Sequence, residues 1–274
     1  MRRKRNYFLI TSASIAASIL VAISTIHILN QTTTTDIDLQ AIAERMDIQT
    51  VDEVTLITAK EQLNLDEGAF IKYSKEGKVA VNSQVLKEKE EKVTDEQEYN
   101  QLLVPPGKRA QIELSDGTHL VVNSQSKVIY PRRFKGDTRK IYAQGEVFLE
   151  VAHDKKHPFI VESEDFNLRV LGTKFNISNY KGGTTNIVLV EGSVEVTDKN
   201  ERKAQLAPND LLNVADGMIT SQKKVDVAEY ISWVDGIMLL NGNELSQIIQ
   251  KLSIYYGISI QCDLSVGSER VYGK

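Results

Sequence analysis

His153 and His157 have the spacing in this chain that most suggests chemistry. Two histidines four residues apart on a helix can offer both imidazoles to one metal ion. Here the pair lies in the run HDKKHP, which is charged, contains a proline and stands between two strand-like stretches. Such a composition is typical of a solvated turn. We therefore predict no metal site and no bound cofactor.

The carboxylates of Glu146 and Glu150 are a second candidate for chemistry. Their even spacing places them on one face of a strand. Nothing in that spacing suits the paired carboxylates of a glycosidase, so we expect salt-bridged surface residues. No serine stands in a nucleophile-elbow sequence either. The sequence predicts no catalytic residue and no enzymatic activity.

Short strands are the elements that must hold these residues. From Leu103 to Val214, brief β-branched or alternating stretches recur at a spacing of roughly ten residues. Ala110–Leu114 and Leu120–Val122 flank the dipeptide Asp116-Gly117, which accepts the positive φ angles of a tight type I′ hairpin turn. A sandwich, a barrel or a solenoid fits this pattern. We predict a mainly β chain built as a short-stranded sandwich or solenoid.

The amino-terminal region predicts a membrane anchor. Four basic residues, Arg2 to Arg5, precede 22 uncharged residues, Phe8 to Leu29. That length at helical rise crosses the hydrocarbon core of a bilayer. The apolar residues that would face the lipid are Phe8, Ile10, Ile15, Leu20, Val21, Ile26 and Leu29. The alternative is a signal peptide cleaved after the small residues Ala22 and Ser24, although the apolar run is longer than such peptides usually have.

Both interpretations export the rest of the chain. Basic residues ahead of the apolar run favour a cytoplasmic amino terminus. The single cysteine, Cys262, excludes an intramolecular disulfide, which a bacterial periplasmic protein of this size does not need. A net charge of -4 with no basic stripe argues against direct binding of nucleic acid. We expect a single-pass protein of the inner membrane with the bulk of the chain in the periplasm.

The carboxyl-terminal region has a different pattern of apolar residues from the strands before it. Ile237–Leu240 is an apolar stretch that predicts a strand, and Asn243 stands where a helix N-cap belongs. Apolar residues then recur at helical spacing up to Tyr256, and Gly257 follows at a position typical of a helix C-cap. Ile258–Ile260 predicts a second strand. The region is expected to form a small β-α-β module.

Several short motifs occur in order along the middle of the chain. They are Val104–Gly107, Leu114–Thr118, Val122-Asn123, Tyr130-Pro131, Phe134, Gly145–Val151, His157–Val161, Val170–Ile177 and Leu189–Val194. In combination they resemble the periplasmic domain of FecR-type regulators, the anti-sigma or sigma-regulator proteins of cell-surface signalling. Glycines of these motifs, such as Gly117 and Gly145, are expected to supply turns. The carboxyl-terminal module resembles part of the STN-like module that follows this domain in many such regulators.

The resemblance implies a domain order for the whole chain. Residues 1–6 would be a cytoplasmic stub, 7–29 the transmembrane anchor, and 30–100 a periplasmic β-rich lead-in with a charged linker. Residues 101–222 would be the all-β FecR-like domain, and 230–274 a partial STN-like β-α-β module.

The resemblance also implies a function. An outer-membrane TonB-dependent receptor would contact the carboxyl-terminal module through its periplasmic signalling domain, and the regulator would relay that state to an extracytoplasmic-function sigma factor. Strand addition or helix packing would use exposed residues of the module. The residues predicted to contact this partner are Ile237, Leu239, Glu244, Gln247, Gln250 and Lys251.

Contact with the sigma factor itself depends on a cytoplasmic domain. In the family such a domain precedes the anchor, whereas only Met1–Asn6 precede it in this sequence. Six residues cannot hold a sigma factor, so we expect that contact only through a longer amino terminus or another subunit. The alternative function is that of an exported β-rich binding protein for a glycan or another component of the cell envelope.

Overall fold

A computed structural model describes residues 38–45, 48–86, 98–263 and 265–274. The predicted anchor, 7–29, and the charged run Lys87–Lys92 lie outside the described residues. Within the described ranges, no helix has both the length and the apolar character needed to cross a membrane.

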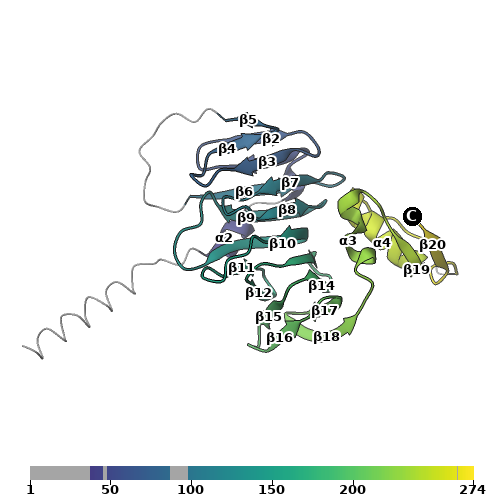
Figure 1. The fold of residues 1–274 in the computed structure, drawn as a ribbon. Coiled ribbons are helices and arrows are strands. Elements are labelled where there is room, and N and C mark those ends of the chain that lie inside the picture. Colours follow the sequence, from purple (N-terminus) through teal and green to yellow (C-terminus); the bar gives the residue numbers. More distant parts are fainter. Residues whose placement is uncertain (1–37, 46–47, 87–97, 264) are drawn as a thin grey trace, which may run out of the picture. The chain divides into compact units, whose positions relative to one another are not determined.

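Eighteen strands, β1 to β18, precede the C-terminal region of the described chain (Figure 1). They are β1 (Val54–Ile57), β2 (Gln62–Leu65), β3 (Phe70–Tyr73), β4 (Val79–Val81), β5 (Gln84–Val85), β6 (Tyr99–Val104), β7 (Ala110–Glu113), β8 (His119–Val122), β9 (Ser126–Pro131), β10 (Arg139–Glu150), β11 (Phe159–Glu162), β12 (Phe166–Val170), β13 (Lys174–Asn179), β14 (Thr185–Glu191), β15 (Val194–Asp198), β16 (Lys203–Leu206), β17 (Asp210–Ala215) and β18 (Met218–Lys224). The mainly β prediction is confirmed.

The strands form two facing layers, which we call the first and second layers of the β-body. The first layer has the order β2-β1-β6-β9-β10-β11-β12-β15-β16. The second has the order β5-β4-β3-β7-β8-β10-β13-β14-β17-β18. Two pairs, β10–β11 and β3–β7, are parallel and the others are antiparallel. Strands from the predicted lead-in and from the FecR-like region therefore share both layers.

Strand β10 belongs to both layers, because it passes from one to the other at Gly145 as a continuous strand. Its first half pairs with β9 and β11, and its second half pairs with β8 and β13. Gly145 has φ +94°, and a Cβ atom there would lie 2.6 Å from the Cα of Ser126. The expectation that Gly145 supplies a turn is wrong. It lies inside a strand, where a missing side chain lets two backbones approach closely.

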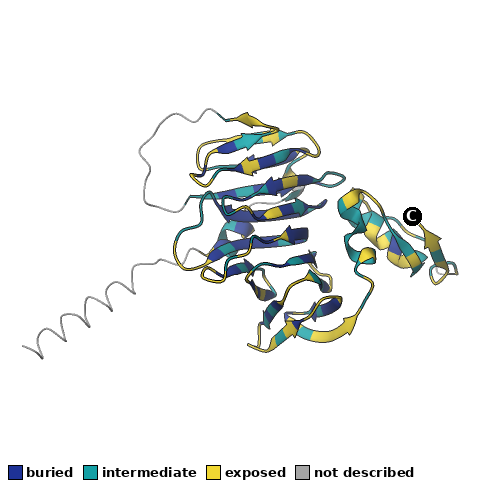
Figure 2. Cartoon of the chain, in the orientation of Figure 1, coloured by how far each residue is buried: buried dark blue, intermediate teal, exposed yellow. Residues whose placement is uncertain are grey.

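The core lies between the two layers, as the dark blue inner faces in Figure 2 show. In strands such as β7 and β12 alternate residues point inward, so the period of two seen in the sequence becomes one buried face. The layers meet at Tyr73 of β3 and Tyr130 of β9, whose rings pack edge to face at 5.5 Å. Their hydroxyls lie 3.1 Å apart, and Asn100 donates to that of Tyr73. The buried polar groups of this contact therefore have partners.

The predicted hairpin at Asp116-Gly117 is present, but its turn differs from the expected type. Strands β7 and β8 pair antiparallel, and the Leu114 N–H donates to the Thr118 carbonyl. A type I′ turn needs two residues with positive φ, whereas here Gly117 has φ +85° and Asp116 does not. The loop therefore has three residues. Asp116 uses its side chain instead, and accepts hydrogen bonds from the Thr118 N–H and hydroxyl.

A short helix covers part of the outer face of the first layer. In α2 (Leu39–Glu44), Leu39 and Ala43 pack with Ile129 of β9 and Tyr142 of β10. The Lys127 ammonium donates to the Ala43 carbonyl at the helix end, where a cation stabilises unpaired carbonyls. The 3-10 turn η1 (Ile48–Thr50) follows before β1.

The chain after β18 forms α3 (Ala228–Ile231), η2 (Ser232–Asp235), β19 (Leu240–Glu244), α4 (Leu245–Tyr256) and β20 (Arg270–Gly273). We call residues 228–273 the C-terminal module. The helix predicted there is confirmed as α4, and Gly257 ends it with φ +67°. The N-cap is Glu244 rather than the predicted Asn243, and its N–H donates to Gln247 Oε1 at 3.2 Å in a capping box.

The two strands of the module differ from those predicted. Ile237–Leu239 is not a strand, because the Ile237 N–H donates to the Ser232 carbonyl and the Leu239 N–H to the Ser232 hydroxyl. Ile258–Ile260 is not a strand either, because its amides bond back to Ser253 at the helix end. The observed sheet pairs β19 with β20, antiparallel, with a bulge between Asn241 and Asn243.

Candidate functional site

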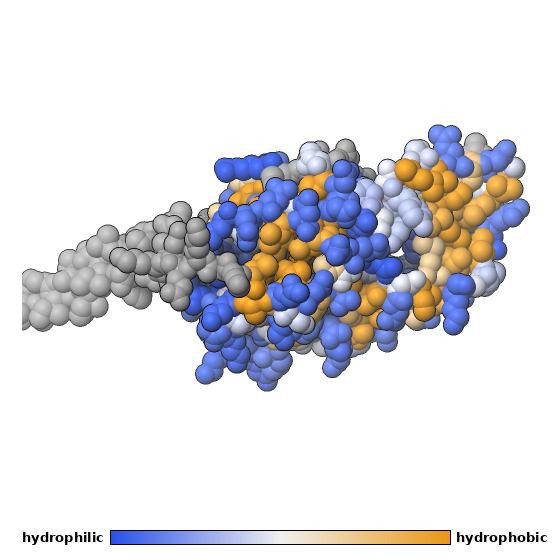
Figure 3. All heavy atoms as spheres, turned by 90° about the horizontal axis from the view of Figure 1, so that it is seen from above, coloured by the Kyte–Doolittle hydropathy of each residue, from blue (hydrophilic) through white to orange (hydrophobic). Residues whose placement is uncertain are grey.

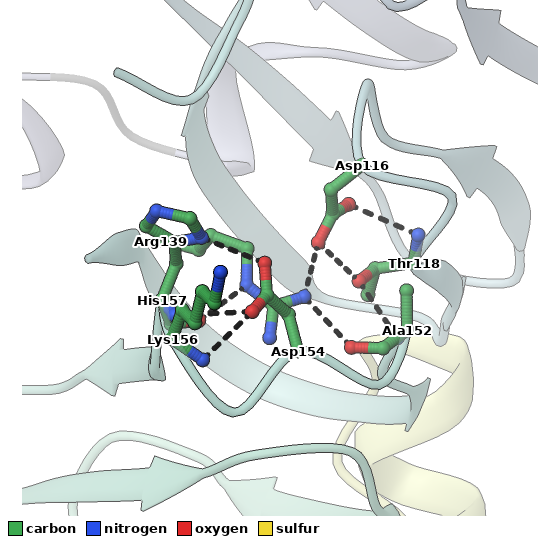
Figure 4. Close-up of polar contacts among 7 residues, drawn as sticks. All are labelled: Asp116, Thr118, Arg139, Ala152, Asp154, Lys156 and His157. Carbon is green, nitrogen blue, oxygen red and sulfur yellow. Dashed lines mark hydrogen bonds and ion pairs between the residues drawn. The ribbon is translucent and has the colours of Figure 1, made fainter. Parts of the chain in front are cut away.

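The run HDKKHP forms a turn that its own hydrogen bonds close (Figure 4). Asp154 accepts from the amides of Lys156 and His157, and its other oxygen lies 2.7 Å from His157 Nδ1. The hydrogen bond from His157 lowers the pKa of Asp154 to about 2. Among the described residues, no group of three His, Cys, Asp or Glu side chains could hold a metal ion. These residues stabilise a turn.

Arg139 connects that turn to the β7–β8 loop (Figure 4). Its guanidinium donates to Asp116 Oδ2 at 2.7 Å, to the Ala152 carbonyl at 2.8 Å and to the His157 carbonyl at 2.9 Å. It also lies over the Phe159 ring at 5.3 Å. The Arg139 side chain is only 5% exposed, so this ion pair is buried. Its geometry is that of a structural cross-link between loops.

Glu146 differs from the salt-bridged surface residue that the sequence predicts. Its two carboxylate oxygens accept from Asn176 Nδ2 at 3.1 Å and from Asn123 Nδ2 at 2.7 Å. Burial raises the pKa of Glu146, while these two amides and the charge of Lys251 oppose that rise. Glu150 does follow the prediction, since it is exposed and pairs with Lys174 at 3.4 Å.

Asn176 lies in a row of residues on the outer face of the second layer. Directly paired positions across five strands carry Val121, Phe148, Asn176, Val188 and Leu211. Their sequence neighbours point into the core, so alternation makes these residues point outward. All except Val121 are nevertheless buried. Another part of the chain must therefore cover this face.

Trp233 of η2 is one residue that covers the row. Its indole Nε1–H donates to Asn176 Oδ1 at 3.2 Å, and its carbonyl accepts from Arg109 Nη1 at 2.6 Å. An indole suits such a place, because its large apolar ring can pack on apolar neighbours while its N–H finds an acceptor. The sequence reasoning missed Trp233, although its being the only tryptophan of the chain was a signal.

The end of α4 also contacts the β-body. The Tyr255 carbonyl accepts from the Gly107 N–H at 2.7 Å and from the Ser124 hydroxyl, and the Ile254 carbonyl accepts from the Gln125 side chain. These bonds satisfy carbonyls that a helix end leaves without intrahelical partners. A Cβ at Gly257 would lie 2.6 Å from Pro106, so glycine permits the close approach. The C-terminal module therefore contacts the body at both η2 and α4.

The six residues predicted to contact a partner differ in their exposure. Ile237 is 43% exposed, and Gln247, Gln250 and Lys251 are exposed on α4. Leu239 is partly buried. Glu244 and Gln247 cap α4, and the charge of Lys251 acts on Glu146. Ile237, Gln247 and Gln250 thus remain the residues with most surface available, and their role stays a prediction.

Exposed apolar residues gather on the C-terminal module. Figure 3 shows hydrophobic surface over this module, at the right of the view. The large hydrophobic residues exposed there are Ile237, Tyr256, Ile258 and Tyr272. Such residues are expected where one protein binds another.

A polar groove of about 650 Å³ lies on the β-body beside Tyr142, Asp165 and Lys199. Its one aromatic lining residue, Tyr142, is only 3% exposed, and Asp165 and Lys199 pair at 3.0 Å. The groove therefore offers no open aromatic ring on which a sugar could stack. Nothing in this geometry favours the alternative function of glycan binding.

The described chain is a two-layered β-body with an attached, partly apolar C-terminal module. The family model described as "FecR protein" matches residues 100–195. No curated protein matches the chain. Two crystal structures of a candidate anti-sigma factor from Parabacteroides distasonis ATCC 8503, at 2.50 and 1.65 Å resolution, are similar to it. Both are 30% identical with a TM-score of 0.56, and the match covers 64% and 63% of this chain and 83% and 82% of theirs. The chain belongs to the FecR family of anti-sigma-type regulators.

Proposed function

We propose that this protein is a membrane-anchored periplasmic regulator that relays the state of an outer-membrane TonB-dependent receptor to an extracytoplasmic-function sigma factor. The observation that carries the proposal is its similarity to a candidate anti-sigma factor over most of that protein's length. Family membership supports a sigma-regulator type of function and no enzymatic role.

The C-terminal module, which we interpret as STN-like, receives the signal in this proposal. The exposed apolar residues of the module suit a protein partner, and the predicted contact Ile237 is 43% exposed. The receptor's periplasmic signalling domain would bind there by strand addition beside β19–β20 or by packing on α4. The anchor predicted at 7–29 would place the module in the periplasm and carry the signal inward.

A pull-down of the full chain from detergent-solubilised membranes tests this function. The signalling domain of the cognate receptor should retain the chain, and the signalling domain of an unrelated receptor should not. Retention of the chain to the same extent by both domains, or no retention by the cognate domain, would overturn the proposed relay.

A further inference from the structure

Asn176 is held so that its carbonyl faces the C-terminal module. Its amide nitrogen donates to Glu146 Oε1, and a carboxylate oxygen can accept that bond but cannot return one. The carbonyl oxygen of Asn176 is thereby left for a donor from outside the β-body, and the indole of Trp233 supplies it. Glu146 is held in turn by Asn123, whose own carbonyl accepts from the Ser124 N–H. The orientation of the acceptor is therefore fixed from inside the body.

The C-terminal module has little apolar core of its own. No residue of α3 or η2 is buried, and Ile248 is the one buried residue of α4. A two-stranded sheet such as β19–β20 is marginally stable without further packing. The module therefore depends on its contact with the body, where Trp233 lies on the buried row around Asn176.

The contact is built so that it can also open. On release, Asn176 would exchange its bond to Trp233 for a bond to water, while Asn123 and Glu146 would keep their bonds within the β-body, so none would be left as an unpaired buried group. The cost of opening would come from exposing the indole and the apolar neighbours of Asn176. An element with two satisfied arrangements is what a conformational switch requires.

We infer that Trp233 is a reversible latch, closed through Asn176 and Glu146, that holds the C-terminal module on the β-body and opens when a partner binds the module. The role of the partner rests on the proposed function. Binding couples to the latch because Gln247, Gln250 and Lys251 lie on α4, whose end is bonded to the body, and the charge of Lys251 acts on Glu146. A partner that draws Lys251 away from Glu146 would weaken the closed arrangement.

Tryptophan fluorescence reports on the environment of Trp233 alone, because it is the only tryptophan of the chain. Asn176→Ala removes the acceptor of the indole and should raise the ratio of open to closed molecules by about tenfold. The expected readout in the full chain is emission at longer wavelength and stronger quenching by acrylamide. Asn179→Ala is the matched control: it changes a buried asparagine of the same strand, which bonds to Ser163 and Thr185 rather than to the module.

Arg109→Gln is a second variant on a loop, for use if Asn176→Ala does not fold. It removes the bond to the Trp233 carbonyl and should shift the emission in the same direction. Unchanged emission in the folded variants, or an equal shift in Asn179→Ala, would overturn the latch.

Binding to the receptor's signalling domain tests the opening step. If release accompanies binding, Asn176→Ala should bind more tightly than the unaltered chain, since its open state is already populated. Equal or weaker affinity would overturn the opening step. Failure of the unaltered chain to bind would instead overturn the proposed function, and the fluorescence comparison would still decide whether the latch exists.

Discussion

Asp116 Oδ2 lies 2.7 Å from Arg139 Nη1, in an ion pair whose side chains are 13% and 5% exposed. The same carboxylate closes the β7–β8 loop through Thr118, and the same guanidinium bonds the carbonyls of Ala152 and His157. One buried pair therefore connects the start of β10 to two loops, β7–β8 and β10–β11.

Asp116→Ala should destabilise the protein by about 3–5 kcal/mol, because it leaves the buried charge of Arg139 without its partner. Urea unfolding measures the change. Glu150→Ala is the control, since it breaks an exposed pair with Lys174 and should cost less than about 1 kcal/mol. Similar losses in the two variants would show that the Arg139 pair is not buried in solution.

Gly145→Ala should destabilise the β-body by about 3 kcal/mol, since the new methyl group meets the backbone of Ser126 and the residue must keep a positive φ. Gly182→Ala provides the comparison. Gly182 also has a positive φ, but nothing lies within 4 Å of its added Cβ, so about 1–2 kcal/mol is expected. Thermal unfolding measures the loss of stability in both variants. Equal losses would contradict the close approach of β10 to Ser126 at Gly145.

Glu146 predicts a pH dependence of stability. Its pKa is raised in the folded protein, so the stability that it contributes is fully present below its unfolded pKa and is lost as pH rises through the folded value. Glu146→Gln removes this titration. The free energy of unfolding of the unaltered chain minus that of the variant should therefore fall as pH rises above the ordinary glutamate pKa. A difference that grows with pH would mean that the hydrogen bonds, rather than burial, dominate.

Asp154 should titrate at about pH 2 while His157 is present. His157→Gln should move the midpoint toward the ordinary aspartate value of about 3.9, as followed by the carboxyl carbon resonance. Because the pKa is lowered, the contribution of Asp154 to stability is present above its unfolded pKa and is lost as pH falls through about 2. An unchanged midpoint in the variant would assign the shift to the backbone amides alone.

Ile237→Asp should weaken binding of the receptor's signalling domain by at least about tenfold, because it places a charge on an apolar residue of the proposed contact. Isothermal titration with the full chain measures the affinity. Val85→Asp, on β5 of the β-body, replaces another exposed apolar residue and should leave binding unchanged. Binding that survives Ile237→Asp would move the contact elsewhere on the module.

Strands such as β7 and β12 were predictable because each has its own alternation of polar and apolar residues. Local signals also located α4, whose apolar stripe and Gly257 are visible in the sequence. The strand at Ile237–Leu239 was wrongly predicted, because apolar character alone cannot show that its amides bond back to Ser232. Hydrogen-bond partners outside a segment decided its conformation.

The candidate site was harder to predict, because its residues are far apart in sequence. Glu146, Asn176 and Trp233 come together only when β10 pairs with β13 and the C-terminal module covers that pair. Asn123 and Asn176 belong to two of the sequence motifs, Val122-Asn123 and Val170–Ile177, but those motifs do not indicate that the two side chains bond to Glu146. Long-range pairing of this kind leaves no pattern within a single segment.

The path of β10 through both layers has a mechanical consequence. A pull applied to either layer is carried to the other along a continuous main chain, without depending on side-chain contacts. The two layers therefore cannot separate as independently folded sheets. The β-body should unfold as a single unit when it is stretched. Two fragments produced by a cut at Gly145 should need each other in order to fold.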